Sequence, residues 1–272
     1  MRPSRRALLT ALSVPCIAPR ARSQEVVLRA GGTGMALAAF RLVGDHFTTH
    51  NPGSALEVLP SLGTNGGLRA LQAGTIDMAL LARPLRAEEE ARGLRARPYA
   101  RTAIAVVTSG GTTTTDITLP QIGAILRGEV TTWPDGRRLR LVRREESDAD
   151  WQLLASMSPE MARSVALALR RPGLVTVGTD QENAEALQTI SGSIGLMSIG
   201  QMRAERLRLR ALALDGVNAS MAEVEAGRYA LSRTLHVAWQ ASPRPGVASF
   251  LDFLAGAEAG SVLEGLGYGS PS

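Results

Sequence analysis

The feature that most constrains this chain is residues 58–85, in which two short apolar segments each end in a loop. The first loop is rich in glycine and precedes a helical pattern over residues 68–73. The second apolar segment, residues 76–81, runs into another loop. Strand, glycine loop, helix and strand in this order are typical of an α/β protein, whose ligands bind beyond the carboxyl ends of the strands.

The glycine loop at residues 63–67 suits an anion because a helix follows it. The first N–H groups of a helix have no partner within the helix, and they lie at the positive end of its dipole. Such backbone donors do not depend on side-chain identity. We therefore take this loop as the strongest sign of a ligand cleft.

Two further junctions have the same form. Residues 26–30 predict a strand, residues 31–34 form a second glycine loop, and helical spacing follows over residues 35–50. Residues 139–142 predict a strand that leads, through two arginines, to a helix over residues 149–157. A single glycine loop is also a common tight turn, so these junctions indicate an anion site only together.

The charge of the chain argues against a nucleic-acid or membrane-surface partner. Its 30 basic residues, all arginine, exceed its 25 acidic residues, for a formal net charge of +5. Five of these arginines lie in the first 23 residues, which contain no acid, so 25 basic and 25 acidic residues remain. A near-neutral protein lacks the basic surface that nucleic acids and anionic membranes attract.

The beginning of the chain predicts an export signal over residues 1–23. A basic start is followed by an apolar run, residues 7–18, that is too short to span a bilayer. The arginine pair at residues 5–6 also resembles a twin-arginine signal, and an ordinary secretory signal is an equal alternative. Cys16, the only cysteine, lies in this segment, so the mature chain has no disulfide, thiol nucleophile or thiolate metal site.

The rest of the chain alternates strands and helices without an internal repeat. Strands over residues 102–108 and 235–239 are the natural crossings between two lobes. The other predicted helices cover residues 86–93, 119–126, 183–190, 247–255 and 259–266, and the other strands cover residues 56–59, 193–197 and 207–214.

Two sharper chemical interpretations are weaker than their plain alternatives. His46 and His50 are four residues apart on a predicted helix, which suits a metal, but they are better explained as polar residues at a helix end. Ser147, Asp148 and His236 could suggest a hydrolase, but no nucleophile elbow surrounds Ser147. We therefore expect no catalytic residues, no metal and no cofactor.

A series of short motifs runs in order through the mature chain. They are residues 32–34, 62–67, 76–77, 82–85, 125–128, 142–147, 192–195, 214–217 and 227–233, with Trp133. In this order they resemble the phosphate-binding-type solute receptors of bacterial ABC transporters, within the type II periplasmic binding proteins. Each motif is weak alone, and their collinear order is strong.

The resemblance implies a two-lobed α/β type II periplasmic binding protein fold, with two crossover strands and a cleft between the lobes. Residues 24–100 and 233–272 would form one lobe and residues 101–232 the other. It also implies a monomeric, non-enzymatic periplasmic receptor that hands a small, phosphate-like oxyanion to an ABC transporter permease. By the same resemblance the ligand-binding residues are Thr33, Gly34, Thr64, Asn65, Arg83, Arg144 and Ser147.

Some of these assignments leave alternatives open. Arg144 is preferred over Arg143 as the arginine that faces the ligand. Ser147 is also a good N-cap for the helix that follows. Arg83 could pair with the ligand, or it could bridge to Glu88, Glu89 or solvent.

Two departures from the family pattern bear on the ligand. Phosphate binders of the family place a carboxylate where this chain has Ala82, and that acceptor takes the proton of hydrogen phosphate. Asp148 stands where the family often has glycine. It would repel an oxyanion if it faced the cleft, and would be harmless if it only capped the helix. These departures favour an alternative function, a degenerate relative that serves as a sensor or protein-interaction subunit.

Overall fold

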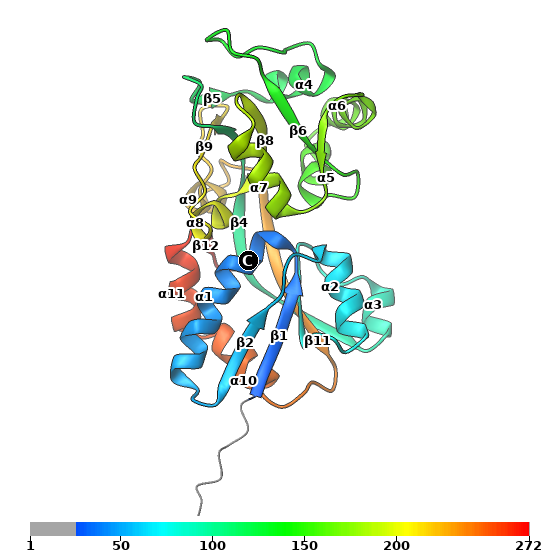
Figure 1. Ribbon diagram of the computed structural model, residues 1–272, viewed down its shortest axis with the longest axis vertical. Coiled ribbons are helices and arrows are strands. Elements are labelled where there is room, and N and C mark those ends of the chain that lie inside the picture. The colour runs from blue at the N-terminus through cyan, green and yellow to red at the C-terminus, as the bar shows by residue number, and fades with distance from the viewer. Residues whose placement is uncertain (1–25, 272) are drawn as a thin grey trace, which may run out of the picture.

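The structure is a computed structural model that describes residues 26–271. The predicted export signal, with Cys16 and its arginine pair, lies outside the described residues. The molecule is elongated, with two α/β lobes stacked along its long axis (Figure 1). This arrangement confirms the predicted two-lobed α/β fold.

The lower lobe in Figure 1 is built on a mixed sheet. Its strands lie in the order β2 (Ser54–Val58), β1 (Val26–Gly32), β3 (Met78–Leu81), β11 (Ser232–Gln240) and β4 (Leu94–Ser109). The first three are parallel, whereas β11 runs antiparallel to β3 and β4. The short strand β12 (Tyr268–Gly269) also pairs with β4.

Helices cover both faces of this sheet. On one face lie α1 (Gly34–His50), α10 (Val247–Leu254) and α11 (Ala257–Gly265), and on the other lie α2 (Gly63–Gln72) and α3 (Ala87–Ala91). The rings of Phe47 and Phe250 meet edge to face at 5.0 Å between centroids. Such contacts lock α1, whose first turn enters the cleft, against α10.

The sheet of the upper lobe is built on the second half of β4, residues 104–109. There β4 pairs with β8 (Ser193–Ser198) and β9 (Leu209–Ala211), and β8 is followed by β6 (Arg140–Arg144) and β7 (Val175–Val177). A separate pair is formed by β5 (Asp116–Ile117) and β10 (Ala213–Leu214). The helices of this lobe are α4 (Leu119–Arg127), α5 (Ala149–Ser156), α6 (Pro159–Arg170), α7 (Asp180–Thr189), α8 (Ile199–Ala204) and α9 (Met221–Glu225).

The long strand β4 joins the two lobes. Its residues 94–103 pair with β11 and its residues 104–109 pair with β8 and β9, so it crosses where predicted. The return crossing differs from the prediction. Residues 235–239 lie within the lower sheet, and the chain crosses just before them, where Leu231 accepts a hydrogen bond from the Ile104 amide.

The predicted glycine loop at residues 63–67 is the first turn of α2 rather than a loop before it. Gly63 has a left-handed φ of +63°, which starts the helix abruptly after Leu62. A Cβ on Gly67 would lie 2.9 Å from the Gly32 Cα, so this glycine lets α2 pack directly on the end of β1. Because glycine has a low helix propensity, the sequence predicts a loop where the structure has a helical turn.

The sequence pattern also missed several elements, most of them short. Helices α6, α8 and α9 and strand β7 were not predicted, although Ser158 followed by Pro159 is a clear start signal for α6. The strand expected over residues 207–214 divides into β9 and β10, which pair with different partners.

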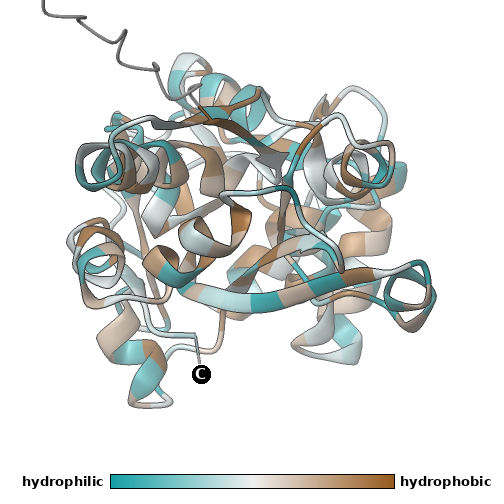
Figure 2. Ribbon diagram, turned by 90° about the horizontal axis from the view of Figure 1, so that it is seen from below, coloured by the Kyte–Doolittle hydropathy of each residue, from teal (hydrophilic) through white to brown (hydrophobic). Residues whose placement is uncertain are grey.

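Seen along the long axis, the outer helices mix brown and teal segments, as expected of helices with one buried face (Figure 2). Between residues 26 and 271, no helix is long and apolar enough to cross a membrane.

Candidate functional site

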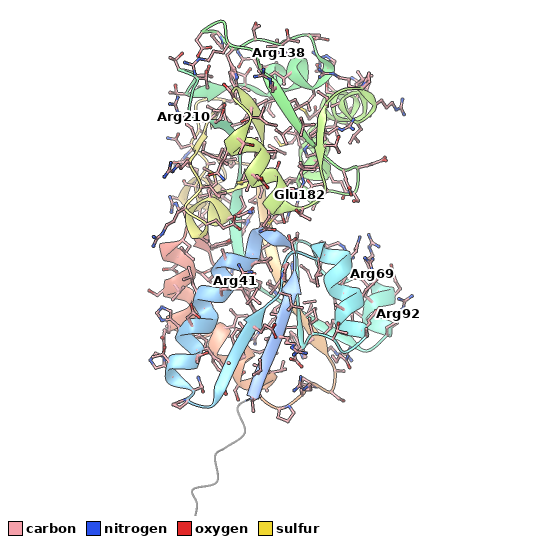
Figure 3. All side chains as sticks on the ribbon, viewed as in Figure 1. Arg41, Arg69, Arg92, Arg138, Glu182 and Arg210 are labelled. Atoms are coloured by element: carbon pink, nitrogen blue, oxygen red, sulfur yellow. The ribbon has the colours of Figure 1, made fainter. Side chains whose placement is uncertain are left out.

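A cleft of about 510 Å³ lies between the lobes. The amino-terminal ends of four helices line it, α1 and α2 from the lower lobe and α5 and α7 from the upper lobe. Three of these ends were expected from the sequence, and α7 was not. In Figure 3, Arg69 on α2 and Glu182 on α7 mark the two sides of the junction between the lobes. Converging helix amino termini favour negative charge between them.

The end of α1 is already hydrogen-bonded to a carboxylate of the opposite lobe. Asp180 Oδ2 accepts a hydrogen bond from the Met35 amide at 2.9 Å and from Thr33 Oγ1 at 3.3 Å. Gln181 Nε2 donates to the Gly34 carbonyl at 3.1 Å. A Cβ on Gly34 would lie 2.7 Å from the Asp180 Cβ, so this glycine allows the close approach of α7.

The end of α2 holds two side chains in defined orientations. Thr64 Oγ1 accepts a hydrogen bond from the Ala82 amide at 3.0 Å, which leaves the hydroxyl proton of Thr64 available to another acceptor. Asn65 Oδ1 accepts from Arg83 Nη2 at 3.0 Å, which leaves the amide N–H groups of Asn65 available. Both side chains line the cleft.

Arg83 is held by a carboxylate of its own lobe. Its Nη2 and Nη1 lie 2.7 Å and 2.8 Å from the two carboxylate oxygens of Glu89. This hydrogen-bonded pair raises the pKa of Arg83 and lowers the pKa of Glu89. Of the alternatives that the sequence left open for Arg83, the structure has the bridge to Glu89, while the guanidinium also borders the cleft.

Arg144 turns into the cleft and Arg143 turns away from it. Arg144 is only 6% exposed, and its Nη2 lies 2.8 Å from Asp148 Oδ2 and 3.2 Å from Asp180 Oδ1. Burial lowers the pKa of Arg144, but the carboxylates of Asp180 and Asp148 outweigh burial and raise it. Arg143 instead bonds to Thr176 Oγ1 and to carbonyls at the end of α6.

Asp148 both caps a helix and faces the cleft, two roles that the sequence had presented as alternatives. Its Oδ1 accepts from the Asp150 and Trp151 amides, both at 3.1 Å, so Asp148 and not Ser147 is the N-cap of α5. Its Oδ2 pairs with Arg144. Ser147 lies in the cleft wall beside it.

A third carboxylate, Asp150, is buried behind the cleft. It is 6% exposed, and its Oδ1 lies 3.3 Å from Nη2 of Arg233, near the start of β11. Burial raises the pKa of Asp150 to about 7, with the neighbouring Asp148 carboxylate adding to that rise. Asp150 thus gains or loses a proton near neutral pH.

The balance of charge differs from that of a simple oxyanion pocket. Arg144 and Arg233 face the carboxylates of Asp148, Asp150 and Asp180. Ala82, as expected, offers no acceptor on its side of the cleft, but Asp148 and Asp180 bring acceptors from the other lobe. An anion at Arg144 or at the amino terminus of α1 would therefore compete with these carboxylates.

The sequence interpretation missed Asp180, although a signal was present. Thr179 and Glu182 form a capping box at the start of α7, the S/T-x-x-E pattern that marks a helix amino terminus. That pattern would have revealed a fourth helix end. It would not have revealed that Asp180 reaches α1, because the two elements are far apart in the chain.

The other chemical candidates do not form sites in the described chain. His46 and His50 lie at the exposed end of α1 beside Glu258, each with Nδ1 3.2 Å from Glu258 Oε1. Within residues 26–271 no group of three or more His, Cys, Asp or Glu residues could hold a metal ion. His236 lies on β11 and does not line the cleft.

The comparisons with known proteins identify the family. A sequence model of the PBP superfamily domain matches residues 19–258, and the chain therefore belongs to this family. A search of curated proteins finds no match.

Solved structures share the fold at low sequence identity. A phosphate ABC transporter substrate-binding protein from Clostridium perfringens, solved with bound phosphate, is 20% identical with a TM-score of 0.75, over 90% of this chain and 100% of that one. An ABC-type phosphate transport receptor from Vibrio cholerae is 18% identical with a TM-score of 0.61, over 90% and 100%. The regulatory domain of CcmR from Synechocystis, in complex with 2-PG, is 16% identical with a TM-score of 0.53, over 84% and 95%.

Proposed function

We propose that this member of the PBP superfamily is a solute receptor that binds a small, phosphate-like oxyanion in the cleft between its lobes. The proposed ligand-binding residues come from both lobes. Five of them line the cleft, namely Thr33, Thr64 and Asn65 from the lower lobe and Arg144 and Ser147 from the upper lobe. Gly34 is the first residue of α1, and Arg83 holds Asn65 in place.

One observation carries this proposal: Thr64 and Asn65 are fixed at the amino terminus of α2 with donor hydrogens to spare. The Ala82 amide occupies the Thr64 oxygen and the Arg83 guanidinium occupies the Asn65 oxygen. The hydroxyl proton of Thr64 and the amide hydrogens of Asn65 therefore remain to donate, next to backbone N–H groups that also donate. A cluster of pre-oriented donors at a helix end suits an oxyanion.

The carboxylates across the cleft bear on which oxyanion binds. Asp148 can accept a hydrogen bond from a protonated oxyanion but not from fully ionised sulfate, which leaves it facing like charge. We therefore expect hydrogen phosphate to bind more tightly than sulfate. This discrimination would come from the upper lobe, because alanine replaces at position 82 the carboxylate that phosphate binders of the family have there.

Export and delivery complete the proposed function. The segment over residues 1–23 would direct the chain to the periplasm, by the twin-arginine or the general route. There the lobes would close around the anion, and the closed form would dock on an ABC transporter permease. The substrate-binding protein and the transport receptor that share this fold support this part, although at low sequence identity.

Calorimetric titration of the mature chain with phosphate, sulfate, molybdate and tungstate tests the proposal. We expect heat with phosphate, and weaker or no heat with sulfate. Absence of heat with all four anions would refute it.

Two variants make the test specific for the donors on α2. Thr64→Val removes the hydroxyl and should weaken phosphate binding about tenfold, whereas Thr64→Ser retains it and should bind like the parent chain. Thr113→Val changes an exposed threonine in a surface turn and is the matched control. Equal affinity of Thr64→Val and Thr113→Val would place the anion elsewhere.

A second candidate is a degenerate relative that acts as a sensor or protein-interaction subunit. It is favoured by the pairing of Arg144 with Asp148 and Asp180, because these carboxylates neutralise the charge of Arg144 without any ligand. The CcmR regulatory domain shares the fold, which shows only that a protein with this fold can be a regulatory domain. Oxyanion found in the cleft of the purified protein would count against this candidate, and binding of a protein partner without anion would favour it.

A further inference from the structure

The carboxylate of Asp180 occupies the position that an anion would take at the amino terminus of α1. It accepts hydrogen bonds from the Met35 amide at 2.9 Å and from the Thr33 hydroxyl at 3.3 Å. These are a helix-end N–H and the hydroxyl that precedes it, the donors that bind oxyanions at other helix ends. The donors belong to one lobe and the acceptor to the other, so this contact ties the lobes together.

Asp180 is not needed to start its own helix. Thr179 is the N-cap of α7, with its side chain bonded to the Glu182 amide, and Glu182 completes the capping box. The Asp180 side chain, 13% exposed, instead points across the cleft. Its local role is limited to the modest benefit of an acid in the first turn of a helix.

Asp180 also binds the arginine that is proposed to hold the ligand. Its Oδ1 lies 3.2 Å from Arg144 Nη2, whose other carboxylate partner is Asp148. The Thr33 hydroxyl, the Met35 amide and the Arg144 guanidinium thus all converge on one carboxylate. An external anion with access to these three groups would make the same contacts.

We propose that Asp180 is an internal competitor of the ligand and sets the affinity and selectivity of the cleft. This inference rests on the proposed function, in that an oxyanion is the ligand with which Asp180 competes. The carboxylate holds the lobes together without ligand, and an incoming anion must displace it from α1 and Arg144. Only an anion that makes more hydrogen bonds than a carboxylate, as a tetrahedral oxyanion with four oxygens can, gains from the exchange.

Asp180→Ala tests the competition directly. The variant frees the α1 donors and removes one negative charge near Arg144, so it should bind inorganic phosphate at least tenfold more tightly than the parent chain by calorimetry. Glu160→Ala is the matched control, because Glu160 is an exposed acid in the first turn of α6, outside the cleft. If the parent chain binds phosphate, an affinity of Asp180→Ala equal to or below that of the control would overturn the proposal.

Small-angle X-ray scattering without any anion separates this proposal from the proposed function. Asp180→Ala should give a larger radius of gyration than the parent chain and Glu160→Ala, because the tie between the lobes is lost. If neither chain binds phosphate, the proposed function fails, and the scattering then decides: opening supports Asp180 as the internal occupant, and an unchanged radius overturns it. Phosphate binding by Asp180→Ala alone also supports the proposal.

Asp180→Asn serves if Asp180→Ala does not fold. The amide keeps the shape and one acceptor oxygen, but it removes the charge that pairs with Arg144. Phosphate affinity should rise several-fold over that of Glu160→Gln. An affinity no higher than that of Glu160→Gln would overturn the proposal.

Discussion

Arg144 and Asp148, four residues apart in the chain, form a buried ion pair with 2.8 Å between Nη2 and Oδ2. The arginine is the last residue of β6, and the aspartate is the N-cap of α5. The same aspartate caps α5 through its other oxygen. The cleft and the fold of the upper lobe are therefore linked at this pair.

Removal of the Arg144 charge should destabilise the protein strongly. Arg144→Gln leaves two nearly buried carboxylates, Asp148 and Asp180, without their cation, and loss of one partner of a buried pair costs about 3–5 kcal/mol. The measurement is the urea midpoint at pH 7. Arg228→Gln breaks a pair with Glu223 that is exposed to solvent, and it should cost much less than Arg144→Gln. Similar losses in both variants would show that the cleft pair is not structurally important.

The capping role of Asp148 can be separated from its charge. Asp148→Asn retains an acceptor for the Asp150 and Trp151 amides, whereas Asp148→Ala loses it and should be about 1 kcal/mol less stable than Asp148→Asn. Ser147→Ala is the control and should stay within about 0.5 kcal/mol of the parent chain. Denaturant unfolding measures the stability of all three variants. If Ser147→Ala lost more stability than Asp148→Ala, Ser147 would be the N-cap of α5.

The raised pKa of Asp150 predicts a dependence of stability on pH. The unfolded carboxyl titrates near its ordinary pKa of 3.8 and the folded one near about 7, so the folded protein retains a proton that the unfolded chain releases. Stability from this group is therefore lost as pH rises from about 4 to about 7. Asp150→Asn should remove that loss, and its unfolding free energy relative to the parent chain should rise by about 1–3 kcal/mol over this range.

Asp252→Asn is the control for this pH series, because Asp252 is exposed on α10. Its unfolding free energy should follow that of the parent chain at each pH. A flat difference between Asp150→Asn and the parent chain between pH 4 and 8 would mean that Asp150 is ionised throughout.

Gly34 should be essential for the contact between the lobes. A Cβ at this position would lie 2.3 Å from Gln181 Oε1 and 2.7 Å from the Asp180 Cβ. Gly34→Ala should therefore hold the lobes apart and enlarge the radius of gyration by small-angle scattering, with each lobe still folded. Gly260→Ala adds a methyl group where nothing lies within 4 Å and should leave the radius unchanged. A compact Gly34→Ala variant would contradict the expected clash.

Much of the fold could be predicted because its signals are local. Alternating strand and helix patterns placed α1, α4, α5, α7 and the main strands within a few residues. The errors have local causes too. Three glycines made the first turn of α2 look like a loop in the sequence. Ser147 and Asp148 are adjacent and both are good caps, so the packing of the upper lobe decides which one caps α5.

The sequence by itself determined the fold class, the glycine-marked junctions between strand and helix, and the residues that supply donors to a cleft. Those features follow from backbone conformation and hydrophobic spacing, which act over a few residues. Only the tertiary structure decided which acceptors meet these donors. Asp180 and Met35 are 145 positions apart, and a hydrogen bond acts over about 3 Å, so their contact exists only because the two lobes dock as they do.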